Sequence, residues 1–207
     1  MRSAVRRRLV TCLAWLPALA CLLAIPDAAS AGWTTRFDPH FHKYSKRYFG
    51  ADFDWRWWKA QAIAESGLDS TARSWCGAQG LMQIMPGTWE GIAPKLGVTS
   101  PWLVKDNIQA GIYYDARMWA IWKAPRPLEE RIAFTLASYN AGPGNILKAQ
   151  RLVAGGVKTS EWASVAAKLH LVTGRSSAQT CGYVTRIQHL RQSLLEHVRA
   201  AWAGDSF

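Results

Sequence analysis

The sequence predicts a mainly α-helical domain with little β-structure. Apolar residues recur at helical spacing over most of the chain after residue 52. Gly and Pro residues divide these stretches into lengths that are typical of helices. The chain has 207 residues and contains no internal repeat or low-complexity tract. Its folded part is therefore expected to be one domain with a sizeable core.

The start of the chain is typical of a secretory signal peptide, which we place at residues 1–31. Four arginines precede an apolar run over residues 9–25, and a small-x-small site follows at residues 29–31. A membrane anchor and a lipoprotein signal at Cys21 are the alternatives. The apolar run is short for a bilayer span and continues past the cysteine. We therefore expect a periplasmic or secreted mature protein without a stable membrane span.

The net charge of the chain is +11. Residues 1–31 hold four arginines and one aspartate, so the mature part carries a net charge of +8. A basic exported protein suits an anionic polymer or surface, such as a cell wall. Nucleic acid would suit such a charge inside the cell, but the export signal and the lack of a long Lys/Arg run argue against it.

Two cysteines, Cys76 and Cys181, lie outside the predicted signal peptide. In an oxidising compartment a single pair of cysteines favours one disulfide. Two independent buried thiols are the alternative. Metal binding is not predicted, because the one suggestive cluster, Asp38 with His40 and His42, has no matching distant ligands.

The first predicted elements lead to a single notable carboxylate. Residues 32–52 are expected to form an irregular lead-in. From Asp52 a wide apolar face predicts a helix that Gly67 ends. A loop rich in Ser, Thr and Gly follows at residues 69–80, and then a candidate short extended piece at residues 81–86. The remaining expected elements are helices at about 88–96, 106–122, 128–141, 146–154, 160–172 and 183–201, with a polar loop at 173–180.

Glu65 lies at the C-terminal end of the helix that Gly67 ends. The helix dipole disfavours negative charge there, which would raise the pKa of the carboxyl group. A Gly-rich turn and an apolar stretch from Leu81 to Met85 follow in the sequence. An acid that protonates a glycosidic oxygen needs such apolar surroundings to keep its proton. The alternative is a solvated glutamate at a helix end.

Four motifs resemble the signatures of soluble lytic transglycosylases. They are Glu65-Ser66, Gly77-Ala78-x-Gly80-Leu81-Met82-Gln83-Ile84-Met85-Pro86-Gly87-Thr88, Ala137-Ser138-Tyr139-Asn140-Ala141-Gly142, and Tyr183-Val184 with Arg186-Ile187. Asn107-Ile108-x-Ala110-Gly111 is also similar to this family. The motifs occur in the family's order. The resemblance implies a single lysozyme-like domain over residues 53–202, with the architecture of goose-type lysozymes and lytic transglycosylases.

The resemblance also implies roles for the matching residues. Glu65 would be the single catalytic acid and later the base, without a metal or a cofactor. Six further residues would contact the saccharide: Ser74, Gln83, Met85, Tyr139, Asn140 and Tyr183. Gln179 stands where many members have a glutamate. Asp69 and Asp115 are candidates for a second carboxylate, but we expect them to cap helices or face solvent. One or two of Trp55, Trp57, Trp58 and Trp75 are expected to stack on sugar rings.

The implied reaction is cleavage of the β-1,4 bond between N-acetylmuramic acid and N-acetylglucosamine in peptidoglycan, with 1,6-anhydro-muramic ends as products. A goose-type muramidase that uses water, and a non-catalytic wall-binding accessory of a secretion or conjugation machine, are the alternatives. We expect a monomer that acts on glycan strands. Cys76 and Cys181 each lie two residues from a proposed site residue, so we predict a disulfide between them.

Overall fold

The computed structural model describes residues 33–154 and 156–204, and the predicted signal peptide lies outside these residues. The described chain is mainly helical, as the sequence predicts, and it forms no named strand. Isolated bridges join Arg73 to Gln79 and Gln79 to Ile84. The α-helices are α1 (Asp38–Phe49), α2 (Arg56–Ser66), α3 (Pro86–Leu96), α4 (Val104–Ile121), α5 (Leu128–Ala141), α6 (Pro143–Arg151), α7 (Trp162–Thr173) and α8 (Ser176–Gly204), with a short 3-10 helix at Val157–Ser160.

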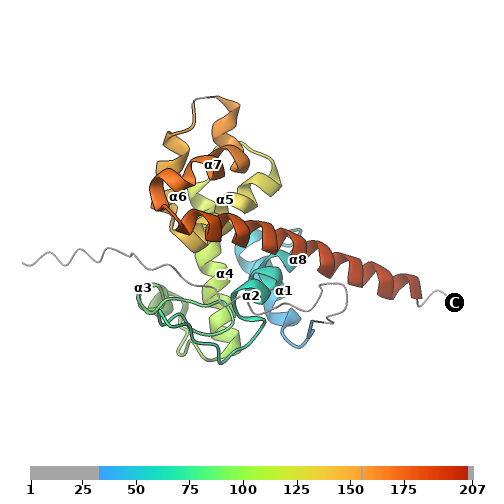
Figure 1. Ribbon diagram of the computed structural model, residues 1–207. Helices are drawn as coiled ribbons and strands as arrows, with labels where there is room; N and C mark the ends of the chain where they lie inside the picture. Colours follow the sequence, from blue (N-terminus) through green and yellow to red (C-terminus); the bar gives the residue numbers. More distant parts are fainter. Residues whose placement is uncertain (1–32, 155, 205–207) are drawn as a thin grey trace, which may run out of the picture.

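The long helix α8 crosses the molecule, and the other helices lie on either side of it (Figure 1). It packs against α2, α5 and α7. In the view of Figure 1, α5, α6 and α7 lie above α8, while α1, α2 and α3 lie below it, and α4 runs between the two groups. None of the helices in the described ranges combines the length and the apolar composition that a bilayer span requires.

The segment before α2 differs from the expected irregular lead-in, because most of it forms α1. Phe37, Phe41 and Tyr44 are buried at helical spacing and pack into the core. Asp38 in the first turn also forms an ion pair with the buried ammonium of Lys59 on α2, at 2.6 Å. The apolar stripe was present in the sequence, and the prediction of irregular structure there is wrong.

Two further expectations are wrong in detail. The polar loop expected at residues 173–180 is largely the first turn of α8, which begins at Ser176. Thr180 is buried there and donates its hydroxyl hydrogen to Asn140 Oδ1 at 2.8 Å, so tertiary contacts override the polar composition of this segment. The piece expected to be extended at residues 81–86 starts as a turn over residues 81–83 and has its bridge at Ile84.

Cys76 and Cys181 are both free, so the predicted disulfide is not formed. The prediction took both residues to lie near the site because Cys181 is two positions from Tyr183. In an α-helix two positions correspond to a rotation of about 200°, so these side chains point in nearly opposite directions. Cys181 packs against the hydrophobic core, where burial raises the pKa of its thiol.

Candidate active site

Glu65 stands at the C-terminal end of α2, as expected. Gly67 ends the helix in the left-handed conformation, at φ 67°, and its N–H bonds the Ile63 carbonyl at 2.9 Å. The half-buried carboxyl of Glu65 accepts a hydrogen bond from the Tyr183 hydroxyl at 2.6 Å. Tyr183 comes from α8, so the site lies where α2 and α8 pack together.

Burial raises the pKa of Glu65 to about 7, from 4.5 for a free glutamate. The hydrogen bond from Tyr183 and the positive charge of Arg186 act in the opposite direction, since both stabilise the carboxylate. Arg186 lies one helical turn after Tyr183 on α8. Burial is the larger effect, and the group is therefore poised to hold or release a proton close to neutral pH.

The Gly-rich segment after α2 is held by side chains from three helices. Ser66 on α2 donates a hydrogen bond to the Leu81 carbonyl at 2.9 Å, and Tyr139 on α5 donates one to the Met82 carbonyl at 2.7 Å. Asn107 on α4 accepts from the Met82 N–H at 2.8 Å and donates to the Gln79 carbonyl at 3.0 Å. Because neighbouring backbone groups are bound from several sides, the segment is fixed in place beside the end of α2.

Two glycines let this segment approach α4 closely. Gly80 has φ +73°, and a Cβ atom there would lie 2.4 Å from the side-chain nitrogen of Asn107 on α4. A Cβ atom on Gly111 of α4 would lie 2.7 Å from the Met82 side chain. Met82 itself is fully buried. The glycines in these two motifs are therefore required by the packing of the wall next to Glu65.

The structure brings some of the predicted residues together at Glu65. Tyr183 contacts Glu65 directly, and the Glu65 charge also raises the pKa of Tyr139, after the larger effect of burial. A carboxylate near a phenol raises the pKa of the phenol because it disfavours a second negative charge. Two tyrosines from two different helices, α5 and α8, thus surround the carboxyl group at the end of α2.

The other predicted residues make their hydrogen bonds with groups other than the Glu65 carboxyl. Ser74 Oγ accepts from the Ala78 N–H at 2.9 Å. Gln83 has φ 47° and donates its side-chain amide to two backbone carbonyls of the same loop. Asn140 Oδ1 accepts from Thr180 at 2.8 Å. Met85 is 45% exposed. Among the described residues, these four side chains form no hydrogen bond with the Glu65 carboxyl.

Asp115 is a carboxyl group of the site that sequence reasoning placed wrongly. We expected it to cap a helix or to face solvent, but it lies in the middle of α4 and is fully buried. It accepts a hydrogen bond from Gln61 on α2, one turn before Glu65, at 3.2 Å. Its position in the apolar series of Ile108 and Ile112 was the signal that could have located it in the core. Asp69, in contrast, is exposed and accepts hydrogen bonds from Thr71, in agreement with the expectation.

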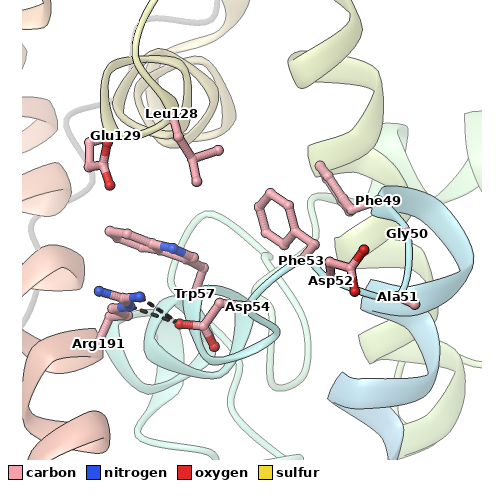
Figure 2. A pocket seen from close by; sticks show the side chains of 10 residues that line it. All are labelled: Phe49, Gly50, Ala51, Asp52, Phe53, Asp54, Trp57, Leu128, Glu129 and Arg191. Carbon is pink, nitrogen blue, oxygen red and sulfur yellow. Dashed lines mark hydrogen bonds and ion pairs between the residues drawn. The ribbon is translucent and has the colours of Figure 1, made fainter.

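A separate hollow of about 350 Å³ lies near the other end of α2 (Figure 2). It is lined by the segment before α2, the start of α5 and part of α8. Trp57 and Arg191 face it, and Arg191 makes an ion pair with Asp54 at 2.8 Å. Of the residues predicted to contact substrate, this hollow is lined by Trp57, a candidate for stacking on a sugar ring, and not by Glu65 or the six predicted saccharide-binding residues.

Comparison with known proteins shows the family to which this chain belongs. Residues 50–161, more than half of the chain, match the Transglycosylase SLT domain family. The chain belongs to this family. The match includes Glu65, the Gly-rich segment and the Tyr139-Asn140 motif, which is the resemblance that the sequence motifs indicated.

Two curated relatives of this SLT family member are lytic murein transglycosylases by name. The chain is 33% identical over 151 residues to the membrane-bound lytic murein transglycosylase F of Desulfosudis oleivorans, across 72% of this chain and 32% of the relative. It is 33% identical over 177 residues to the Vibrio parahaemolyticus protein of the same name, across 79% and 32%. The chain thus spans about a third of the length of these relatives.

Solved structures confirm the predicted architecture. The lytic transglycosylase Slt of Pseudomonas aeruginosa, in an inactive mutant form, superposes with a TM-score of 0.61 at 20% identity, over 79% of this chain and 25% of that one. The 70-kDa soluble lytic transglycosylase in complex with bulgecin A superposes with a TM-score of 0.59 at 22% identity, over 78% and 24%. The fold of this SLT family member is therefore the lysozyme-like one expected from its motifs.

Proposed function

We propose that this chain cleaves the β-1,4 bond between N-acetylmuramic acid and N-acetylglucosamine in peptidoglycan, without water, and that Glu65 is the single acid and base. The observation that carries the proposal is the half-buried Glu65 carboxyl, whose pKa is raised to about 7 by burial while Tyr183 bonds its oxygen. A general acid works best when its pKa lies near the working pH. The family and the names of its relatives support the same chemistry.

In the proposed first step, protonated Glu65 gives its proton to the glycosidic oxygen as the bond from that oxygen to C1 of the muramic residue breaks. The N-acetyl oxygen of the same residue assists from within the substrate, an exception to the two-carboxylate rule. In the second step the ionised Glu65 takes the proton of the muramic C6 hydroxyl, whose oxygen forms the new bond to C1. Glu65 ends the cycle protonated, and the product carries a 1,6-anhydro ring.

The residues around Glu65 suit a saccharide in this proposal. Asn140 uses its oxygen for Thr180, so its amide N–H groups remain to meet an N-acetyl carbonyl. The Ser74 oxygen accepts from the backbone, which leaves its O–H to donate to a sugar. In this proposal Gln83 and Met85 line the saccharide site from the loop, and Tyr139 lines it from α5. Trp75 is 60% exposed next to Ser74 and is the tryptophan that we propose for stacking on a sugar ring. Of the other three candidates, Trp57 and Trp58 are buried, and Trp55 is partly buried with the Arg56 guanidinium over its ring.

We further propose that residues 1–31 are a cleaved signal peptide and that the protein acts as a monomer in the periplasm or outside the cell, where peptidoglycan lies. The catalytic domain would extend over residues 53–202, with α1 as an additional support because it packs against α2 and α4. The basic charge of the chain is suited to an anionic wall polymer.

Digestion of purified murein tests the proposal. The parent protein should release fragments that are lighter by one water than hydrolysis products, as measured by mass spectrometry. Glu65→Gln should lower the rate by about 10² to 10⁴, the usual contribution of general acid–base catalysis. Asp69→Asn is the matched control, since it neutralises an exposed carboxylate close by in the sequence and should leave the rate unchanged.

Three results would contradict the proposal in different ways. Fragments of hydrolytic mass would show a muramidase that lets water attack. Undiminished digestion by Glu65→Gln would remove Glu65 from the chemistry. Binding of murein by the folded parent protein with no fragments released would show a wall-binding accessory instead of an enzyme.

A further inference from the structure

Asp115 and Gln61 form a buried polar pair next to Glu65. Both residues are 0% exposed. Gln61 Nε2 donates a hydrogen bond to Asp115 Oδ1 at 3.2 Å. The two remaining oxygens of the pair, Asp115 Oδ2 and Gln61 Oε1, are buried and have no hydrogen-bond partner. Buried polar atoms are nearly always hydrogen-bonded, so two orphaned oxygens in one pair call for a physical explanation.

A proton on Asp115 provides that explanation. A carboxyl group and a primary amide each present two polar atoms side by side. An amide that donates the N–H on the same side as its own oxygen brings that oxygen beside the other carboxyl oxygen, and this is the arrangement that we infer for Gln61 and Asp115. Two oxygens without a hydrogen between them repel each other, whereas a protonated Asp115 donates its O–H to Gln61 Oε1 and satisfies both atoms. An ionised Asp115 would leave both buried acceptors unpaired.

Four titratable groups interact electrostatically with Asp115, and one of them, Glu65, disfavours its negative charge. They are Glu65 on α2, Tyr139 on α5, Tyr183 on α8 and Tyr114 on its own helix. All of them are acids. Burial, and to a lesser extent the charge of Glu65, raise the pKa of Asp115 well above its ordinary value, against the hydrogen bond from Gln61. Two cations act on neighbouring groups, Arg186 on Glu65 and Arg117 on Tyr114, whereas the groups that act on Asp115 itself are Gln61 and Glu65.

We propose that Asp115 is held as a neutral carboxylic acid paired with Gln61, and that it serves as a positioning residue which leaves Glu65 the only carboxylate of the site to ionise. The pair ties α4 to α2 one turn before Glu65. A neutral Asp115 cannot accept a proton from water or attack a sugar carbon. This second part rests on the proposed function, since it accounts for the use of one carboxyl group as both acid and base.

Carbon-13 NMR of the side-chain carboxyl groups in the whole protein tests the protonation state without any activity. Through-bond correlation to its own backbone assigns Asp115 in the parent protein, and Glu65 is assigned in the same way. The Asp115 resonance should keep the position of a protonated acid from about pH 5 to about pH 8, although free aspartate ionises near pH 3.9. Glu65 should titrate in the same spectra with a midpoint of about 7. An Asp115 resonance at the position of a carboxylate at neutral pH overturns the proposal.

Two variants test the effect on Glu65 through the pH profile of murein cleavage. Asp115→Asn keeps both hydrogen bonds without a charge, so the midpoint should move by less than about 0.3 pH units. Gln61→Glu adds a second carboxyl that must share one proton with Asp115, and the new negative charge should raise the midpoint by about one unit. An ionised Asp115 in the parent predicts the reverse pattern: a fall of about one unit for Asp115→Asn and little change for Gln61→Glu.

The two arms separate the inference from the proposed function. If the protein does not cleave murein, the proposed function fails while the NMR titration still decides the state of Asp115. If murein is cleaved to anhydro products and Asp115 titrates as an ordinary carboxylate, the inference fails and the proposed function remains.

Discussion

Replacement of Glu65 by glutamine should change how the stability of the protein depends on pH. The pKa of Glu65 is about 7 in the folded protein, against 4.5 for a free glutamate. The folded state therefore binds this proton more tightly than the unfolded state. The contribution to stability is fully present below about pH 4.5 and is lost as the pH rises through about 7. At about 1.4 kcal/mol per pKa unit, the loss amounts to about 3 kcal/mol.

Glutamine has nearly the same shape, and its oxygen can still accept the hydrogen bond from Tyr183, but it does not titrate. Urea titrations between about pH 4 and about pH 8.5 give the free energy of unfolding of each protein. The value for Glu65→Gln minus the value for the parent should therefore increase by about 3 kcal/mol as the pH rises. Groups that do not interact with Glu65 titrate alike in both proteins, so the difference reports on Glu65 and the groups coupled to its charge.

Asp69→Asn is a control with the opposite sign. Hydrogen bonds from Thr71 lower the pKa of Asp69, so its contribution to stability is present at neutral pH and is lost as the pH falls. A difference between the parent and Glu65→Gln that stays constant with pH would refute the reasoning. A difference that moves in favour of the parent at high pH would mean that Tyr183 and Arg186 outweigh burial.

Three further predictions follow from named contacts. Tyr183→Phe removes a hydrogen bond that stabilises the Glu65 carboxylate, so the upper pH limit of murein cleavage should rise by about one unit; a fall would contradict this. Gly111→Ala should cost about 1 to 3 kcal/mol of unfolding free energy, whereas Gly91→Ala, on an open helical site, should stabilise by up to about 1 kcal/mol; equal urea midpoints would argue against the close approach at Gly111. Ser74→Ala should lower kcat/KM about fivefold, far less than Glu65→Gln, and an equal loss would give Ser74 a larger role.

The fold could be predicted where apolar spacing and helix-ending residues agree. The end of α2 at Gly67 and the end of α5 before Gly142 were correct, because each glycine ends its helix at a positive φ angle. The start of α8 could not be predicted, because Ser176 and Thr180 are polar. Their helical conformation depends on a buried contact between Thr180 and Asn140 on a distant helix. Local composition carries no information about such a partner.

The sequence predicted some residues of the candidate site correctly and others wrongly. Motifs placed Glu65 and Tyr183 at matching positions, and the structure joins them across 118 positions of sequence. Asp115 was misjudged because composition suggests solvent for an aspartate, while its place in the apolar series of α4 suggests the core. The disulfide was misjudged because closeness in sequence to Tyr183 was taken as closeness in space, which fails for positions two apart on a helix.

The proton affinity of Glu65 depends on how α2 and α8 lie against each other. Burial alone would keep the proton on Glu65 and make it a poor base, while Tyr183 and Arg186 on α8 alone would remove the proton and make it a poor acid. The opposing effects leave a pKa of about 7 when the Tyr183 hydroxyl lies 2.6 Å from the carboxyl oxygen. The ion pair of Arg191 with Asp54, which ties α8 to the segment just before α2, helps to fix this alignment from outside the site (Figure 2). The contacts between the two helices thus tune the chemistry that the site can perform.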